Sequence, residues 1–423
     1  MTPEEAEARL LALELFGMRF GLDRMRRLMT VLGHPEQAFK SIHVVGTNGK
    51  SSTARMIAAI IARHGHRVGT YLSPHLIGFN ERIRVDDEDI TPQQLADALE
   101  RALRGAEQVN RSSGGEDPVT QFELLTAAAY SELAARGVEV AVIEAGLGGR
   151  YDATNVIPSK VQVLTSVGLE HTRWLGPTIT AIAREKLDVV RPGATLVLGA
   201  GMHPDALAVA EEIAALRGAT IVQAEADPHA MVGALGTFQR RNFALARAAA
   251  AAFLGELDEV AVVAAAADVR VPGRLQIVDQ HPLTLLDGAH NPDGIAALTE
   301  SLPEIVAAAR TDDGRVVATV SILDDKDAVA MLSSLAPLCD ALVLTSSHNP
   351  RVLPPPTLSS LLDQLAPDIT LPVEIVREPH AALRRARELA GPGGIVIATG
   401  SLYLISDLMH DEATASGRRA SML

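Results

Sequence analysis

The chain has 423 residues, 47% of them hydrophobic, so it can bury a core large enough for two or three domains. Its 38 basic and 52 acidic residues give a formal net charge of −14, which excludes a general polyanion binder, and its 3% aromatic content argues against a base-stacking surface. The single cysteine, Cys339, excludes an internal disulfide and a metal cage built from cysteines, and its apolar surroundings indicate a core residue.

The N-terminal stretch "MTPEEAEARLLALELF" is acidic and helix-patterned, and it lacks a basic region followed by an apolar one. The sequence shows no apolar run of about 18 residues, the length that a membrane-spanning helix needs. We therefore expect a cytoplasmic protein without membrane contact and without a nucleic-acid partner.

Apolar, β-branched runs alternate with helical patterns through the first part of the chain. The runs lie at 42–45, 67–72, 138–145, 161–167, 194–199 and 219–223. Segments 51–64, 91–108 and 120–137 carry apolar residues at the i, i+3, i+4 and i+7 spacing of an amphipathic helix. This alternation predicts an α/β fold with a P-loop-type, doubly wound parallel sheet, whose ligand binds at the carboxyl ends of the strands.

A second α/β series follows the Pro-Gly-Arg turn at 272–274. Its apolar runs lie at 283–288, 315–322, 341–347, 373–378 and 394–401. We expect a first domain over residues 1–270, a linker over 271–282, and a smaller Rossmann-like α/β domain over 283–423. The polar tail 411–423 has no clear pattern and is expected to be flexible.

The stretch "GTNGKSS" lies between a predicted strand and a predicted helix. In this arrangement the backbone N–H groups of residues 46–49 and the helix N-terminus meet phosphate oxygens, and Lys50 reaches the terminal phosphates. The full Walker pattern asks for glycine where Val44 stands, so the motif is only partly met. A plain helix N-cap by Ser51 or Ser52 is the alternative.

Polar side chains also follow other predicted strands. They are Ser73, His75 and Arg82 after the second run, Glu144 at the end of the third, Glu170 and His171 after the fourth, and Lys186 on the next helix. Hydroxyl, carboxylate and imidazole groups suit a Mg²⁺ ion that bridges ATP phosphates. Taken singly, Glu144 could instead be a capping or ion-paired carboxylate, and His171 a core histidine.

Seven motifs together resemble one family. They are "GTNGKSS", "SPHL…NERI", "FELLTAAAY", "EAGLGGRYDATNV", "GLEHTRWLGPTITAIAREK", "PGRLQ" and "LDGAHNPDG", in this order along nearly the whole chain. The chain resembles the folylpolyglutamate synthases and dihydrofolate synthases, which are relatives of the Mur amide ligases. The resemblance implies ATP-dependent addition of L-glutamate to a folate carboxylate through an acyl phosphate, and it leaves open whether dihydropteroate is also an acceptor.

The resemblance assigns roles by position. The residues expected at ATP are Gly46, Thr47, Asn48, Gly49, Lys50, Ser51, Ser52, Asn242, Arg274 and Asp287. Those expected at two Mg²⁺ ions are Ser73, Glu144, His171 and Lys186. Those expected at the folate or the incoming glutamate are Arg82, Phe122, His290 and Asn291, and the catalytic set is Lys50, His171, Lys186, Asp287 and His290.

Lys186 resembles the family's lysine that takes up CO₂ and becomes a carbamate. An ammonium group with an ordinary pKa near 10.4 repels Mg²⁺, whereas a carbamate is an anion and can coordinate it. An ordinary solvated or ion-paired lysine is the alternative. Dependence on K⁺ stays open.

Three positions depart from the family pattern. Ser51 stands where these synthases usually have glycine, Phe238 precedes Gln239 where a histidine is usual, and Glu170 replaces an aspartate. These departures make the fine specificity less certain without removing a core chemical group.

Two other functions compete with the folate ligase. A Mur-type ligase acting on a cell-wall nucleotide precursor mostly carries a further domain ahead of the glycine loop, but only 45 residues precede Gly46. A P-loop ATPase without ligase activity, or a switch GTPase, would need other motifs, and a guanine-reading sequence is absent. We expect a monomer that acts on small molecules.

Overall fold

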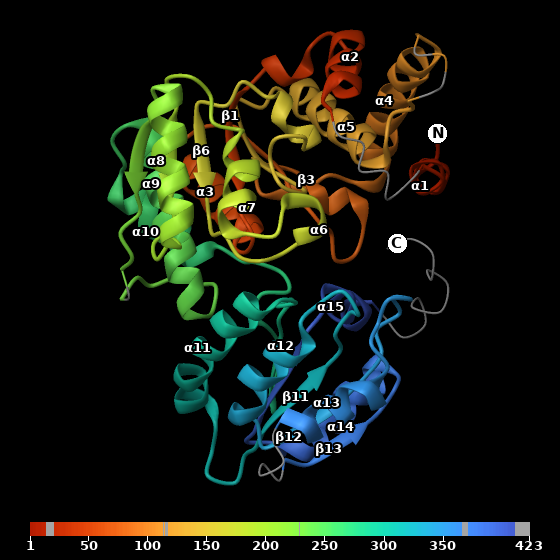
Figure 1. Cartoon of the computed structure of the whole chain (residues 1–423), viewed down its shortest axis with the longest axis vertical. Coiled ribbons are helices and arrows are strands. Elements are labelled where there is room, and N and C mark those ends of the chain that lie inside the picture. Colours follow the sequence, from red (N-terminus) through yellow and green to blue (C-terminus); the bar gives the residue numbers. More distant parts are fainter. Residues whose placement is uncertain (14–20, 113, 115–116, 228, 366–370, 411–423) are drawn as a thin grey trace. The chain divides into compact units, whose positions relative to one another are not determined.

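The structure, a computed structural model, describes residues 1–13, 21–112, 114, 117–227, 229–365 and 371–410. They form two compact units (Figure 1). The first consists of Met1–Gly233 and Arg240–Val269, and the second of Ala234–Gln239 and the chain from Arg270 onward. The tail 411–423, expected to be flexible, lies outside the described residues. No helix in the described ranges has the length and apolar character needed to cross a membrane.

The first unit contains an eight-stranded sheet in the order β4-β3-β2-β5-β1-β6-β7-β8. Its strands are β1 (Lys40–Val45), β2 (Val68–Tyr71), β3 (Ile83–Val85), β4 (Glu88–Asp89), β5 (Val140–Glu144), β6 (Val161–Leu164), β7 (Thr195–Leu198) and β8 (Thr220–Gln223). The pairs from β2 to β8 are parallel, which confirms the α/β prediction. The antiparallel β3 and β4 were not predicted, because strands of three and two residues are too short to show a period.

Helices lie on both faces of this sheet, and further helices pack against those helices. They are α1 (Pro3–Leu11), α2 (Asp23–Val31), α3 (Lys50–Arg63), α4 (Pro92–Ser112), α5 (Gln121–Ala135), α6 (Thr172–Leu175), α7 (Ile179–Leu187), α8 (Pro204–Arg217), α9 (Thr237–Leu254) and α10 (Glu259–Asp268), with 3₁₀ turns η1 (Pro35–Gln37), η2 (Phe79–Arg82) and η3 (Ala153–Val156). Helix α3 packs on β1, β2 and β5, while α5 packs on β2 and β3. Side chains alternate along β2, so Thr70 faces α3 and Tyr71 faces α5.

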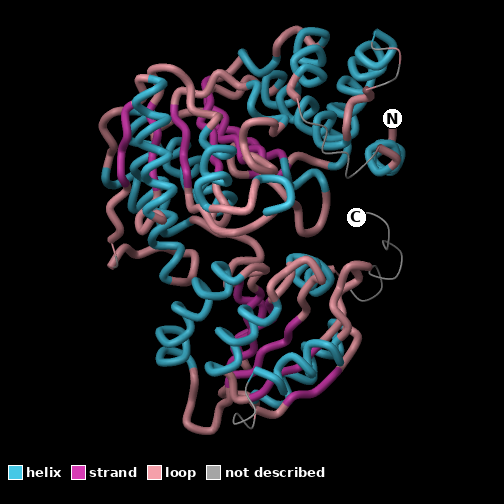
Figure 2. The backbone as a smooth tube through the Cα atoms, in the orientation of Figure 1, coloured by secondary structure: helices cyan, strands magenta, loops and turns pink. Residues whose placement is uncertain are grey.

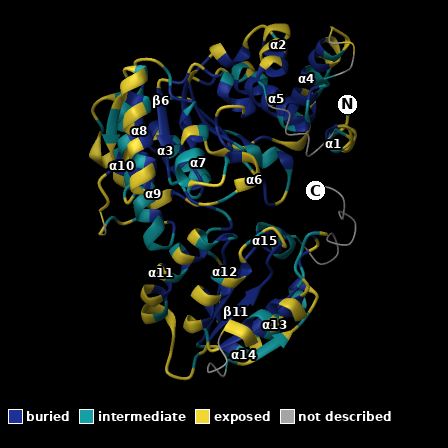
Figure 3. Cartoon of the chain, viewed as in Figure 1, coloured by how far each residue is buried: buried dark blue, intermediate teal, exposed yellow. Residues whose placement is uncertain are grey.

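The central strands are buried on both faces (Figure 3). All five residues of β5, "VAVIE", are buried, as is typical of a parallel strand between two helical layers. Strand β1 has β5 on one side and β6 on the other, so the connections after β1 and β6 leave in opposite directions. This switch point places the glycine loop after β1 where open α/β sheets bind ligands.

The second unit contains a six-stranded sheet in the order β13-β12-β11-β14-β10-β9. Figure 2 distinguishes the helices, strands and loops of the chain by colour. Its elements are β9 (Gln276–Gln280), β10 (Leu283–Leu286), α11 (Pro292–Ala309), β11 (Val316–Val320), α12 (Ala328–Leu335), η4 (Ala336–Leu338), β12 (Ala341–Leu344), α13 (Pro355–Leu365), β13 (Val373–Ile375), α14 (Pro379–Ala390), β14 (Ile395–Thr399) and α15 (Leu402–Met409). Only β9 is antiparallel among these pairs. The interval 271–282, expected as a linker, therefore contains an ordered edge strand.

Cys339 packs against the core of this unit, and burial raises its pKa to about 12.

Candidate nucleotide and metal site

The glycine loop joins β1 to α3 and adopts conformations that favour glycine. Gly46 has φ of +150°, and Gly49, the N-cap of α3, has φ of +85°. A Cβ atom at Gly49 would lie 2.6 Å from Oδ1 of Asn242, and one at Gly46 would collide with the Thr165 hydroxyl. The loop is therefore held close to its neighbours, and Asn242 lies beside it.

Residues at the end of β6 fix this loop by hydrogen bonds. Thr165 Oγ1 donates to the carbonyl of Asn48 over 2.6 Å, and the Asn48 N–H donates to Ser166 Oγ over 3.0 Å. The Thr47 N–H donates to the Ser166 carbonyl over 2.9 Å. Our sequence analysis missed Thr165 and Ser166. Both lie inside the predicted run 161–167, near its carboxyl end, and this position was the available signal.

Two lysines from different helices converge on carbonyls of the loop. Lys50 Nζ, at the start of α3, donates to the Thr47 carbonyl over 3.1 Å. Lys186 Nζ, on α7, donates to the Gly46 carbonyl over 2.8 Å and its side chain is buried. Burial, and then the nearby charge of Lys50, lower the pKa of Lys186 to about 7. A large fraction of Lys186 is therefore neutral near pH 7.

A buried carboxylate lies beside the lysine end of the loop. Glu144 ends β5 and is 1% exposed. The Ser51 hydroxyl donates to its Oε1 over 3.0 Å, and the Ser73 N–H donates to its Oε2 over 3.0 Å. Carboxylate and hydroxyl oxygens are ligands that Mg²⁺ prefers. In the described ranges, no group of three or more His, Cys, Asp and Glu side chains could hold a metal ion by itself.

His171 lies on the loop after β6. It has φ of +52° and caps the short helix α6. Its side chain is 42% exposed, which excludes the alternative of a core histidine. Its Nε2 lies 3.9 Å from the carboxylate of the neighbouring Glu170.

The residues expected at the acceptor lie on the α5 side of the sheet. The Phe122 ring stacks on Tyr71 with centroids 6.2 Å apart, and a Cβ at Gly146 would lie 2.6 Å from that ring. Arg82 Nε donates to His75 Nδ1 over 3.0 Å. Burial lowers the pKa of Arg82.

A buried network that we did not predict holds the glycine-rich segment after β5. Asp152 accepts hydrogen bonds from the Leu147 N–H over 2.7 Å and from the Thr154 N–H and hydroxyl. His43 Nε2 lies 2.8 Å from Thr154 Oγ1, and burial lowers the pKa of His43 to about 3, so the ring is neutral. The hydroxyl of Thr154 donates to Asp152, so we infer that His43 donates to Thr154. The aspartate in "GGRYDATN" was the available signal.

The candidates of the second unit lie around the turn after β10. Asp287 is buried, and its two oxygens accept hydrogen bonds from the N–H groups of Leu275 and Ala289, each over 2.9 Å. Burial raises the pKa of Asp287, against the effect of Arg274, whose guanidinium lies against Gly288.

The next two candidates follow in the same turn. His290 Nδ1 lies 2.7 Å from the Gly288 carbonyl, which can only accept, so Nδ1 carries a proton. Asn291 is buried and caps α11, accepting from the Gly294 N–H over 2.7 Å. Gln239 is buried, and Phe238, at which the resemblance led us to expect histidine, packs against the core of the second unit.

A glycine loop lies between a strand and a helix, two lysines from different helices donate to its carbonyls, and a buried carboxylate lies beside it. These features define a nucleotide-binding enzyme of the P-loop class. Residues 273–402 match the family model described as "Mur ligase, glutamate ligase domain". Together the two units define an ATP-dependent ligase.

Comparisons with known proteins specify the family. The chain is 33% identical to the dihydrofolate synthase/folylpolyglutamate synthase of Bacillus subtilis, over 93% of this chain and 95% of that protein. The folylpolyglutamate synthase of Mycobacterium tuberculosis, complexed with ADP and AMPPCP, has a TM-score of 0.86 and 30% identity, covering 98% of this chain and 99% of that one. The bifunctional folylpolyglutamate synthase/dihydrofolate synthase of Yersinia pestis, complexed with AMPPNP and a Mn ion, has a TM-score of 0.83 and 27% identity, covering 97% of each chain. The chain belongs to the folylpolyglutamate synthase/dihydrofolate synthase family.

Proposed function

We propose that this enzyme uses ATP to join L-glutamate to the γ-carboxylate of a folate. The observation that carries the proposal is the convergence of Lys50 and Lys186 on one glycine loop, beside the Ser51–Glu144 pair. The named relatives support it, because they match over nearly the whole chain and the solved ones hold adenine nucleotides. Dihydropteroate is a second acceptor in this proposal, since many of these relatives are named for both activities.

The triphosphate of ATP lies along the loop in this proposal. The first-unit residues that bind it in this proposal are Gly46, Thr47, Asn48, Gly49, Lys50, Ser51 and Ser52, with Asn242 beside Gly49. Arg274 and Asp287 are the nucleotide candidates of the second unit. The N-terminus of α3 and the charge of Lys50 favour phosphate oxygens at this position. Hydrogen bonds from Thr165 and Ser166 hold the loop in place before ATP arrives, so little reorganisation is needed.

Divalent cations fit the oxygen-rich donor set around Glu144. Glu144 and Ser73 are the proposed ligands of one Mg²⁺, and His171 of a second. When bound, Mg²⁺ neutralises charge on the phosphate oxygens. The buried Glu144 carboxylate is already oriented by the Ser51 hydroxyl and the Ser73 N–H, so its oxygens have a fixed direction.

Lys186 is the proposed carbamate. Its lowered pKa of about 7 leaves much of it as the neutral amine, which is the form that reacts with CO₂. The nitrogen of the neutral amine forms a bond to the carbon of CO₂ and loses one proton, which converts the neutral amine into an anion. The anion suits a position next to a divalent cation, whereas the ammonium form is opposed by burial and by the charge of Lys50.

The reaction has two steps in this proposal. A folate carboxylate oxygen attacks the γ-phosphorus of ATP, ADP leaves, and an acyl phosphate forms. The amine of L-glutamate then attacks the acyl carbon, loses a proton and expels inorganic phosphate. Lys50 stabilises the charge that develops on the transferred phosphoryl group. Arg82 and Phe122 border the acceptor, and His290 and Asn291 place the glutamate.

An assay with separate acceptors tests this function. The purified chain with ATP, Mg²⁺ and labelled L-glutamate receives tetrahydrofolate, dihydropteroate or a muramoyl-nucleotide acceptor. We expect labelled product and equimolar orthophosphate with tetrahydrofolate. Product with the muramoyl acceptor alone would establish a Mur-type ligase, and phosphate release without any amide product would establish an ATPase. Light scattering during gel filtration tests the proposed monomer.

A further inference from the structure

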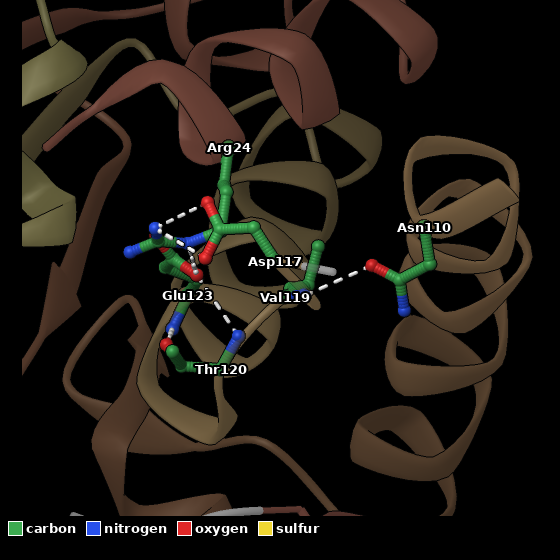
Figure 4. Close-up of polar contacts among 6 residues, drawn as sticks. All are labelled: Arg24, Asn110, Asp117, Val119, Thr120 and Glu123. Carbon is green, nitrogen blue, oxygen red and sulfur yellow. Dashed lines mark hydrogen bonds and ion pairs between the residues drawn. The ribbon is translucent and has the colours of Figure 1, made fainter. Parts of the chain in front are cut away.

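Arg24 is a buried cation on α2, far in sequence from every motif of the site. Its side chain is 8% exposed. Its Nε lies 3.1 Å from each carboxylate oxygen of Glu123, and its Nη1 lies 3.0 and 2.8 Å from the two oxygens of Asp117. Figure 4 shows the three side chains converging from α2, from the segment ahead of α5 and from α5 itself. Burying a charged network of this kind is costly, so its contribution to stability alone is a weak reason for it.

Glu123 links Arg24 to the first turn of α5. The Thr120 N–H donates to Glu123 Oε2 over 2.9 Å, and the Glu123 N–H donates to Thr120 Oγ1 over 3.3 Å, which together form a capping box. The Val119 N–H donates to Asn110 Oδ1 of α4 over 2.9 Å, as Figure 4 also shows. The start of α5 is therefore held from both α2 and α4.

Phe122 lies inside that same first turn. Its ring stacks on Tyr71 and contacts the glycine segment at Gly146. The Thr126 hydroxyl donates to the Phe122 carbonyl over 2.7 Å and lies 3.1 Å from the Tyr71 hydroxyl. A rotation or shift of the first turn of α5 would therefore move the Phe122 ring relative to the strand end that carries Tyr71.

We propose that Arg24 is a positioning residue for the acceptor site. It fixes the first turn of α5, and this turn fixes the Phe122 ring. The inference rests on the proposed function, in which Phe122 borders the acceptor. The planar guanidinium of Arg24 fixes the orientation of two carboxylates, which a lysine ammonium does not do.

Steady-state kinetics of Arg24→Met and Arg24→Lys test the proposal. We expect the KM for the acceptor to rise about tenfold in Arg24→Met and less in Arg24→Lys, while the KM for ATP stays within about twofold. The matched control is Arg101→Met, which removes another ion pair to α5, from Arg101 Nη2 to Glu132 Oε2 over 2.7 Å. We expect this control to leave the acceptor KM unchanged. Equal changes in the acceptor and ATP constants would overturn the proposal.

A double-mutant cycle separates positioning from general destabilisation. If Arg24 acts through Phe122, Arg24→Lys has no further effect on the acceptor KM in a Phe122→Ala background. Additive effects would contradict the proposal. If Arg24→Met does not fold, Asp117→Asn replaces it, because this partner is 48% exposed and its loss is milder.

Hydrogen exchange gives a readout that does not depend on the acceptor's identity. Peptides covering residues 119–126 should exchange faster in the Arg24 variants than in Arg101→Met. If the wild-type chain does not ligate a folate, the proposed function fails, and the kinetic comparison is made with the acceptor it does use. Unchanged exchange in these peptides would overturn the role of Arg24 whatever the substrate.

Discussion

The turns after β1 and after β10 each follow a buried strand with a parallel neighbour, but the first is lined by amines and the second by a carboxylate. After β1, the amines of Lys50 and Lys186 point at backbone carbonyls. After β10, the carboxylate of Asp287 accepts from two backbone N–H groups. The first turn gathers two amine groups, Lys50 and Lys186, where a polyanion would bind, whereas the second uses a buried carboxylate to hold its own backbone. Phosphate binding should therefore depend on side-chain charge in the first unit, and the shape of the second unit's turn on Asp287.

Replacing Lys50 is the strongest challenge to this contrast. Lys50→Met removes the cation from the loop, and we expect kcat to fall roughly 100- to 1000-fold, because a charge that stabilises phosphoryl transfer is lost. ADP binding by calorimetry should weaken as well. Lys40→Met is the control, since Lys40 is exposed at the start of β1, the strand that precedes the glycine loop. Wild-type turnover in Lys50→Met would show that the loop's backbone binds ATP without this charge.

Substitution of Lys186 tests whether the second lysine at the glycine loop becomes an anionic carbamate. We expect Lys186→Ala to reduce kcat roughly 100-fold, with part of the activity restored by small carboxylates such as acetate or formate. An ordinary ammonium at this position predicts no such rescue, because a carboxylate cannot replace a cation. Full turnover by Lys186→Ala would exclude the carbamate.

The same lysine should make stability depend on pH. The pKa of Lys186 is lowered from 10.5 to about 7, so between these values the unfolded chain binds a proton that the folded chain does not. The free energy of unfolding should therefore rise with pH in this window, by up to about 1.4 kcal/mol per pH unit, and the penalty should be fully present below pH 7. Urea unfolding of wild type and Lys186→Met at pH 7 to 10, in CO₂-free buffer, measures this. The slope of the wild type should exceed that of the variant.

Substitution of Asp287 tests the role of the buried carboxylate in the turn after β10. Asp287→Asn replaces one acceptor oxygen by an NH₂ group that faces a backbone N–H, so we expect a loss of roughly 1–3 kcal/mol in the stability of the second unit. Glu144→Gln is the matched change in the first unit. In Glu144→Gln we expect the main effect on the Mg²⁺ concentration for half-maximal activity and a smaller effect on the free energy of unfolding. If Asp287→Asn and Glu144→Gln change the free energy of unfolding and the Mg²⁺ requirement in the same way, the contrast between the two turns is wrong.

Sequence patterns predicted the strands that are long and apolar, such as β1 and β5, and the glycine loop that follows β1. They missed β9, whose short polar-ended stretch "QIVDQ" has no strand period. They also missed the hydroxyls of Thr165 and Ser166, because these act on Asn48 from positions 117 and 118 residues away. His43 and Thr154 meet across 111 residues in the same way. A local sequence pattern predicts only the helix or strand that contains a residue. The order of the strands in the sheet determines which distant residues become its hydrogen-bond partners.

Ser51 offers the smallest and most specific test. It is a position at which the resemblance led us to expect glycine, and its hydroxyl donates to Glu144 Oε1 over 3.0 Å. This bond directs the hydroxyl proton at Glu144 and leaves the oxygen's lone pairs able to face a cation. Ser51→Gly should therefore raise the Mg²⁺ concentration for half-maximal activity about three- to tenfold, while kcat at saturating Mg²⁺ stays within about threefold. Ser51→Thr keeps the hydroxyl and should behave as wild type. A lower Mg²⁺ requirement in Ser51→Gly would mean that the hydroxyl competes with the metal for Glu144 and does not assist it.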